Sequence, residues 1–187
     1  LIFILLLSLI ILLQLNFMAL LVGIISIPLI IIYPLAKRFS KYPQFYLGIV
    51  FSWGVPLGWA STNQSFSIEL IFLYLGTVAW VFGYDSIYSI QDKVDDKKIG
   101  INSTAITFNK NLKLAIAISY LTAIGFWCLV SYSIFWYLGI VILGLHMIWQ
   151  IKKLDTNKPK LALKLFKSNR DMGLLFSISC LINNFFI

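Results

Sequence analysis

The sequence is short of charged residues, and acidic residues are the scarcest. Only 12% of its 187 residues are charged, with seven Asp or Glu against fifteen Lys or Arg. About a quarter of a soluble domain is usually charged, and the 60% of hydrophobic residues here is also unusually high. This composition excludes a soluble domain and a disordered chain, and it leaves little water-facing surface for a nucleic-acid binder. We therefore predict a membrane protein.

Cysteine and histidine are also rare. Cys128 and Cys180 lie in apolar stretches without the spacing of metal ligands, and His146 is the single histidine. This scarcity excludes a disulfide scaffold and a zinc site built from Cys and His. We interpret the cysteines as small packing residues, and we assign no role to His146 or to Glu69, another lone polar residue.

Basic residues are missing from long parts of the chain. All fifteen Lys and Arg, which give a net charge of +8, fall within Lys37–Lys41, Lys93–Lys113 and Lys152–Arg170. Hydropathy outside these stretches predicts about seven membrane spans. The predicted spans are Leu1–Leu15, Phe17–Pro34, Pro43–Ala60, Phe66–Tyr84, Leu112–Val130, Ile134–Gln150 and Met172–Ile187.

The connections between these spans alternate in charge. The three basic loops alternate with uncharged ones at residues 14–16, Ser61–Ser65 and Ser131–Ser133. Positive loops favour the cytoplasmic or matrix side, so we expect the basic loops on that one side. The predicted fold is all-α, a multi-pass transmembrane bundle forming a single domain over residues 1–187. Because Leu1 begins inside an apolar run, we expect this domain to be incomplete at its N-terminus.

Four of the seven acidic residues crowd into the segment YDSIYSIQDKVDDKKIG. A helix continuing from the preceding span would place these side chains on one stripe: Asp85, Tyr88, Asp92 and Asp96. Asp92 and Asp96 would lie about 5–6 Å apart between β-carbons, which like charges tolerate poorly without a cation nearby. Oxygen ligands without His or Cys suit a hard ion such as Mg²⁺, which usually also binds substrate phosphates. The stripe therefore indicates a diphosphate-binding site.

A solvated helix is the competing interpretation of the same segment. In that case its lysines would pair with the acids on an exposed surface. Asp85 argues against this, because it lies at the end of an apolar run, where ionisable groups are costly and usually functional. In both interpretations Gly100 is expected to end the helix.

A cationic cluster, YPLAKRFSK, follows the second predicted span. Tyr33 and Lys37 are four residues apart with Arg38 beside them, so a phenol and an ammonium on adjacent turns could neutralise an anionic head group. An interfacial aromatic anchor with ordinary positive loop charges would give the same pattern. Both clusters are predicted at the basic side of the membrane.

Two segments resemble a known family. The run YDSIYSIQDKVDDKKIGINSTA resembles the second aspartate-rich motif of the UbiA superfamily of intramembrane prenyltransferases. The run YPLAKRFSKYPQFYLGIVFSWGVPLGWA resembles the segment between the two aspartate motifs in the branch that prenylates 4-hydroxybenzoate. The resemblance covers nearly the whole chain and implies a nine-helix bundle, of which this chain would hold the third to the ninth helix.

The resemblance also implies roles for the acidic residues. Asp92 and Asp96 match a DxxxD pair that binds Mg²⁺ and, through it, the substrate diphosphate. Asp85 and Asp95 match further acids of that metal-binding motif.

The cationic cluster matches the family as well. Tyr33 and Lys37 match a YxxxK pair that contacts the diphosphate, with Arg38 as a further diphosphate-binding candidate. Together with Asp92 and Asp96, Tyr33 and Lys37 are the implied catalytic residues.

The activity implied by this resemblance is Mg²⁺-dependent transfer of a polyprenyl group. The donor would be polyprenyl diphosphate and the acceptor the ring of 4-hydroxybenzoate, ortho to its hydroxyl, in ubiquinone synthesis. The expected location is the lipid bilayer of a bacterial inner membrane, or alternatively of the mitochondrial inner membrane. No protein partner is implied.

Alternative functions stay open at this point. Other members of the superfamily prenylate homogentisate, naphthoate or haem, and a non-catalytic transporter or channel subunit could use acids as a cation relay. Transporter sites usually lie at mid-membrane, whereas these acids are predicted at one membrane surface. The family's first motif, NDxxDxxxD, is not found in the sequence, so we expect these 187 residues alone to be inactive.

Overall fold

Helices form the structure, a computed structural model that describes residues 2–62 and 65–185 and contains no strand within those ranges. The elements in chain order are α1 (Ile2–Leu13), α2 (Phe17–Phe39), α3 (Pro43–Phe51), α4 (Gly54–Ser61), α5 (Ile68–Ile99), α6 (Thr104–Thr107), the 3₁₀ helix η1 (Asn109–Asn111), α7 (Leu112–Trp127), α8 (Ile134–Lys153) and α9 (Pro159–Phe185). The all-α prediction is confirmed. The ends of the predicted spans at Leu1 and Ile187, and residues 63–64 of one predicted loop, lie outside the described residues.

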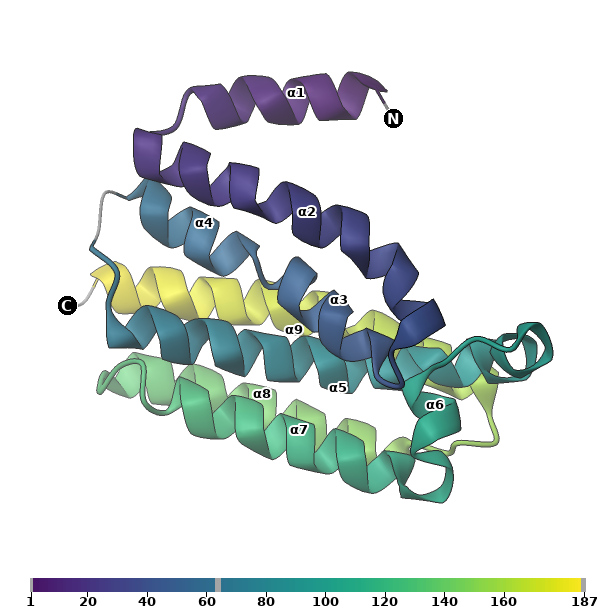
Figure 1. Cartoon of the computed structure of the whole chain (residues 1–187). Helices are drawn as coiled ribbons and strands as arrows, with labels where there is room; N and C mark the ends of the chain where they lie inside the picture. The colour runs from purple at the N-terminus through teal and green to yellow at the C-terminus, as the bar shows by residue number, and fades with distance from the viewer. Residues whose placement is uncertain (1, 63–64, 186–187) are drawn as a thin grey trace.

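Helix α5 organises the bundle. It packs against α3 on one side and α7 on another, with α9 along a third (Figure 1). Two glycines allow α7 to approach closely, because a β-carbon at Gly76 would lie 2.6 Å from Trp127, and one at Gly83 would collide with the Tyr120 ring. Small residues serve this purpose in membrane helix packing. The apolar half of α5 is therefore fixed firmly in the bundle.

The predicted span Pro43–Ala60 is one helix in the prediction and two in the structure. Helix α3 ends at Phe51 and α4 begins at Gly54. Pro56 explains the break, since proline lacks an N–H and its ring collides with the carbonyl four residues earlier, here that of Ser52. The Ser52 carbonyl instead accepts from the Val55 N–H at 2.9 Å. The continuous span predicted here is wrong.

By length and composition, α2, α5 and α8 could each cross a membrane. The other predicted spans are also helical where they are described, but α1 and α7 are short, and α3 and α4 are interrupted.

Helix α9 begins at Pro159 rather than near Met172, because the basic stretch before Met172 alternates apolar and charged residues with helical spacing.

The three basic stretches meet at one end of the bundle, as their alternation along the chain predicts. The Asn102 N–H donates to the Lys37 carbonyl at 3.0 Å, and the Thr107 hydroxyl donates to the Lys41 carbonyl at 2.7 Å. The Lys113 ammonium donates to the Leu154 carbonyl at 3.4 Å. These bonds tie the loop after α5 to the end of α2, and α7 to the end of α8.

A buried set of hydrogen bonds, here called the Gln150 network, joins α7, α8 and α9. The Tyr120 hydroxyl donates to Gln150 Oε1 at 2.6 Å, and Gln150 Nε2 donates to the Leu165 carbonyl at 2.8 Å and to Ser168 Oγ at 3.1 Å. His146 Nε2 lies 2.9 Å from the same Ser168 hydroxyl. The network fixes the first half of α9 against α7 and α8. The contact with Ser168 places His146 beside this network.

Candidate active site

A polar cavity lies between α2, α3 and α5 at the basic end of the bundle. Its volume is about 50 Å³. We call it the carboxylate cavity, and its lining residues are Tyr33, Lys37, Pro43, Gln44, Asp85, Tyr88, Ser89, Asp92 and Asp96. Most of the residues singled out from the sequence therefore lie around one space, although α2 and α5 are far apart in the chain.

The acidic stripe reaches the cavity because α5 continues without a break past its apolar half. Asp85, Asp92 and Asp96 all line the cavity, as their helical spacing predicts. The helix ends at Gly100, whose φ of 75° lies in the left-handed region that glycine adopts readily. The Gly100 N–H donates to the Asp96 carbonyl, so the helix stop fixes the backbone at the last acid of the stripe.

Helix α2 contributes the cationic side of the cavity. Tyr33 and Lys37, one helical turn apart, both face α5, and the Asn102 N–H bonded to the Lys37 carbonyl holds the end of α2 in place. Arg38 is exposed and lies outside the cavity lining. Of the predicted cationic cluster, the structure therefore brings Tyr33 and Lys37 to the acids and leaves Arg38 at the surface.

One ion pair crosses the cavity. Lys37 Nζ lies 3.5 Å from Asp96 Oδ1, and the Asp96 side chain is only 7% exposed. Its second oxygen, Oδ2, is buried without a hydrogen-bond partner among the described residues. An unsatisfied buried carboxylate oxygen is costly, so Asp96 retains an acceptor for a cation or a donor.

Two polar lining residues were not predicted from the sequence. Gln44 Oε1 accepts from the Thr104 N–H at 3.0 Å, and Ser89 Oγ accepts from the Ala105 N–H at 3.2 Å. Both polar groups therefore support the wall by holding α6 against α3 and α5. Gln44 follows a proline at the start of a helix, and Ser89 resembles any helical serine, so the sequence contains no signal that identifies them.

The four acids predicted as metal ligands are not equivalent. Asp95 is exposed and pairs with Lys98 at 3.4 Å, because adjacent helical residues point about 100° apart. Asp85 precedes Asp92 by seven residues, or about 10 Å along the helix. Among the described residues, no three His, Cys, Asp or Glu side chains form a group that could hold a metal ion. The structure therefore brings Asp92 and Asp96 together with Lys37 and places Asp95 elsewhere.

Comparison with known proteins supports the resemblance seen in the two motifs. Residues 1–180 match the UbiA prenyltransferase family. A mitochondrial 4-hydroxybenzoate polyprenyltransferase of Drosophila melanogaster is 37% identical over 94% of this chain and 46% of its own length. The human and Arabidopsis thaliana proteins of the same name are 36% and 38% identical, over 93% and 92% of this chain and 48% and 44% of theirs. The chain thus spans about half the length of these relatives.

The fold agrees with a solved structure. An apo structure of a UbiA homolog from Aeropyrum pernix K1 matches with a TM-score of 0.75 at 22% identity, covering 90% of this chain and 65% of that one. A family match over nearly all residues, together with this shared helical architecture, confirms the resemblance inferred from the two motifs. The chain belongs to the UbiA prenyltransferase family.

Proposed function

We propose that this chain supplies the second aspartate motif and the YxxxK pair of a membrane enzyme that transfers a polyprenyl group to 4-hydroxybenzoate. The donor is polyprenyl diphosphate, and the product belongs to ubiquinone synthesis. The names of the relatives support this acceptor. The observation that carries the proposal is the carboxylate cavity, where Lys37 and Tyr33 face Asp92 and Asp96.

The donor set of the cavity fits Mg²⁺. Asp92 and Asp96 offer carboxylate oxygens four residues apart, and Asp96 Oδ2 is buried without a partner among the described residues. Mg²⁺ prefers such oxygens and usually completes its shell with substrate phosphates. UbiA prenyltransferases generally depend on a divalent metal. Asp92 and Asp96 would hold the ion, with Asp85 deeper on the same stripe, and the bound ion would neutralise charge on the diphosphate.

The chain's own residues then favour departure of the diphosphate. The Lys37 ammonium and the Tyr33 hydroxyl donate to its oxygens as the allylic C–O bond breaks and the electron pair leaves with the diphosphate. The ring carbon of the acceptor ortho to its hydroxyl attacks the allylic carbon and forms the new C–C bond. Loss of the ring proton to the released diphosphate restores aromaticity. The aromatic wall formed by Tyr88 and Phe166, whose ring centroids are 4.8 Å apart, keeps water from the allylic cation.

We also propose the mitochondrial inner membrane as the location, with the basic end of the bundle facing the matrix. The relatives are named as mitochondrial proteins. The positive-inside rule supports this orientation, because all three basic stretches meet at one end.

The decisive experiment is a transfer assay with the full-length protein in lipid vesicles. Polyprenyl diphosphate, isotopically labelled 4-hydroxybenzoate and Mg²⁺ should yield a ring-prenylated product, identified by mass spectrometry, and chelation of the metal should stop its formation. The double variant Asp92→Ala/Asp96→Ala should insert normally and form no product. Prenylation of homogentisate or naphthoate instead would overturn the acceptor assignment, and normal turnover by the double variant would overturn the site.

A further inference from the structure

The side-chain amide of Gln44 lines the carboxylate cavity with only its oxygen in use. The Thr104 N–H donates to Gln44 Oε1 at 3.0 Å, and Gln44 is only 5% exposed. A backbone N–H can only donate, so the amide oxygen must face α6, and this fixes the orientation of the amide. The nitrogen, Nε2, carries two N–H donors and has no hydrogen-bond partner among the described residues.

These free donors reach the cavity rather than closed protein. Asp96 Oδ2 belongs to the fully enclosed polar atoms that lack a partner, whereas Gln44 Nε2 does not. Because Nε2 also lacks a partner, it must retain contact with open space. The open space that Gln44 lines is the carboxylate cavity, which it shares with Lys37 and Asp96.

The backbone holds Gln44 rigidly at the cavity. Pro43, the first residue of α3, is fully buried and has a fixed φ. Gly48 lies one turn after Gln44 on the same face of α3, and a β-carbon there would lie 2.9 Å from the Val78 carbonyl. Helix α3 is therefore packed closely on α5 at this point. A side chain held in this way loses little conformational entropy when it binds a ligand.

Ser89, the other polar residue that contacts α6, has no donor to offer. Its hydroxyl donates to the Ser86 carbonyl at 2.8 Å, accepts from the Ala105 N–H at 3.2 Å and lies 3.1 Å from the Thr104 hydroxyl. A hydroxyl has one donor and two acceptor sites, so these contacts use all of them. Of the two residues, only Gln44 keeps hydrogen-bonding capacity for a ligand.

Free N–H donors in this cavity suit a phosphate oxygen. Three carboxylates line the cavity, those of Asp85, Asp92 and Asp96, and the Lys37 ammonium already lies 3.5 Å from Asp96. A diphosphate adds further negative charge, so it needs donors besides Lys37. An amide nitrogen is a donor and does not ligate a metal ion, so the free end of Gln44 favours the anion rather than Mg²⁺.

We propose that Gln44 is a further diphosphate-binding residue, whose Nε2 donates to a phosphate oxygen of the prenyl donor while Oε1 stays bonded to Thr104. This rests on the proposed function, because it adds a residue to the same diphosphate site. Lys37 and Tyr33 reach the diphosphate from α2, and Gln44 reaches it from α3. The Gln44 bond strengthens as negative charge develops on the departing diphosphate.

Inhibition by inorganic diphosphate tests this contact separately from the prenyl tail. In the full-length protein in lipid vesicles with Mg²⁺, inorganic diphosphate should compete with polyprenyl diphosphate. Gln44→Met keeps a neutral side chain of similar length and removes the donors. The inhibition constant of diphosphate and the KM for polyprenyl diphosphate should both rise about tenfold. The KM for 4-hydroxybenzoate should change less than about twofold.

Two further variants separate the loss of donors from a loosening of α6. Thr107→Val removes another bond of α6, from the Thr107 hydroxyl to the Lys41 carbonyl at 2.7 Å, outside the cavity lining. It should change the inhibition constant of diphosphate less than about twofold. Gln44→Glu keeps an acceptor for the Thr104 N–H and has no N–H donor. It should recover the thermal stability lost in Gln44→Met, but not the binding of diphosphate.

The contact is refuted if Gln44→Met is inhibited by diphosphate like the wild type, or if Thr107→Val raises the inhibition constant as much. Recovery of diphosphate binding in Gln44→Glu would also overturn it, and this variant decides the question if Gln44→Met does not fold. A wild type that neither transfers a prenyl group nor is inhibited by diphosphate would refute the proposed function itself. Wild-type turnover with an indifferent Gln44 refutes only the contact.

Discussion

The carboxylate cavity and the Gln150 network both bury polar side chains between apolar helices, but they satisfy them differently. In the Gln150 network, the amide, a tyrosine hydroxyl and a serine hydroxyl pair within 2.6–3.1 Å. In the carboxylate cavity, opposite charges stand 3.5 Å apart, and Asp96 Oδ2 has no hydrogen-bond partner among the described residues. Paired polar groups hold helices together, whereas an unpaired buried carboxylate oxygen is costly and leaves an acceptor for a ligand.

The largest expected effect is on turnover, and it comes from the carboxylate cavity. Asp96→Asn keeps the size of the side chain and removes its charge, so turnover in the transfer assay should fall at least about a hundredfold, while folding is unaffected. Asp95→Asn makes the same change one residue earlier, at an exposed carboxylate paired with Lys98, and should change turnover less than about twofold. Equal losses of turnover in the two variants would show that a position inside the carboxylate cavity does not set the importance of an acid for the reaction.

Changes in the Gln150 network should lower the free energy of unfolding. Gln150→Leu leaves the buried Tyr120 hydroxyl without its acceptor and the Leu165 carbonyl without a donor from α8. We expect a loss of about 2–3 kcal/mol in the free energy of unfolding, because orphaned buried polar groups cost about 1–3 kcal/mol each. Unfolding by denaturant in detergent micelles measures it. A Gln150→Leu variant as stable as the wild type would show that the Gln150 network does not stabilise the fold. A Gln150→Leu variant that folds but has lost turnover would show that the network also serves the reaction.

The Lys37 side of the cavity should give a smaller effect than its acids. Lys37→Gln removes the ammonium that faces Asp96, so the KM for polyprenyl diphosphate should rise about tenfold, equivalent to about 1.4 kcal/mol of binding. Arg38→Gln removes a neighbouring exposed charge outside the cavity lining, and we expect less than about a twofold change. A larger effect at Arg38 than at Lys37 would contradict the orientation of α2 toward the acids.

An exposed carboxylate outside both regions should show the smallest effect. The backbone N–H of Asn157, followed by the side chain of Lys158, lowers the pKa of Asp155. A lowered pKa contributes stability above the unfolded value, and this contribution disappears as the pH falls through the folded pKa. Asp155→Asn should therefore leave thermal unfolding at pH 7 nearly unchanged, because exposed ion pairs contribute little. The small difference in thermal stability between this variant and the wild type should vanish as the pH falls. A difference that grows in acid would show that the Asp155 carboxylate does not stabilise the folded state.

Helical spacing was enough to predict one half of the cavity. Asp85, Asp92 and Asp96 share a face because α5 is a continuous helix, and Gly100 ends it as its position predicts. The interruption after α3 depended on a single proline within an apolar run. Apolar runs tolerate proline in some membrane helices, as α2 does at Pro28 and Pro34, so composition alone could not locate that break.

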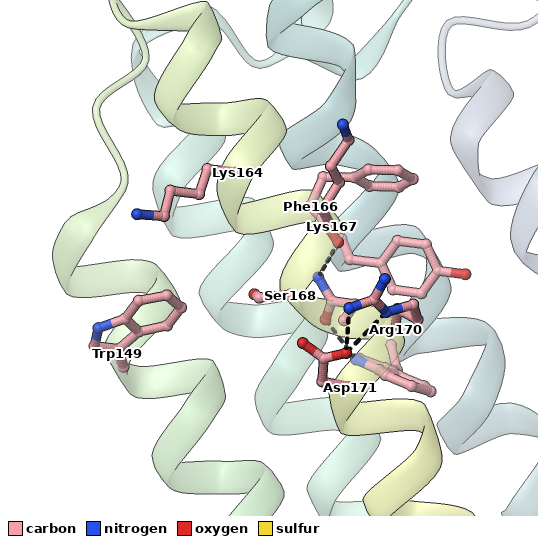
Figure 2. Close-up of a pocket in the computed structure, with 10 residues that line it drawn as sticks. Trp149, Lys164, Phe166, Lys167, Ser168, Arg170 and Asp171 are labelled. Carbon is pink, nitrogen blue, oxygen red and sulfur yellow. Dashed lines mark hydrogen bonds and ion pairs between the residues drawn. The ribbon is translucent and has the colours of Figure 1, made fainter.

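The cavity that Figure 2 shows, between α5, α8 and α9, was not visible in the sequence. Its charged residues were interpreted as part of a basic loop, whereas the structure places them on a helix that packs against α5 and α8. A stretch of lysines and an arginine gives the same hydropathy whether it is a loop or one face of a helix. Its aromatic neighbours Trp80 and Tyr84 come from a segment about ninety residues earlier, as the Trp80–Asn169 bond shows with a separation of 89 residues.

The sequence by itself determined the membrane-embedded all-α class, the family and the stripe of acids on α5, because composition and helical periodicity are local properties of the chain. Only the tertiary structure decided which charges meet. It brought Lys37 to Asp96 and left Arg38 and Asp95 at the surface. Contacts between helices depend on how each helix is rotated against its neighbours, and that rotation is set by packing across the whole bundle rather than by any one segment.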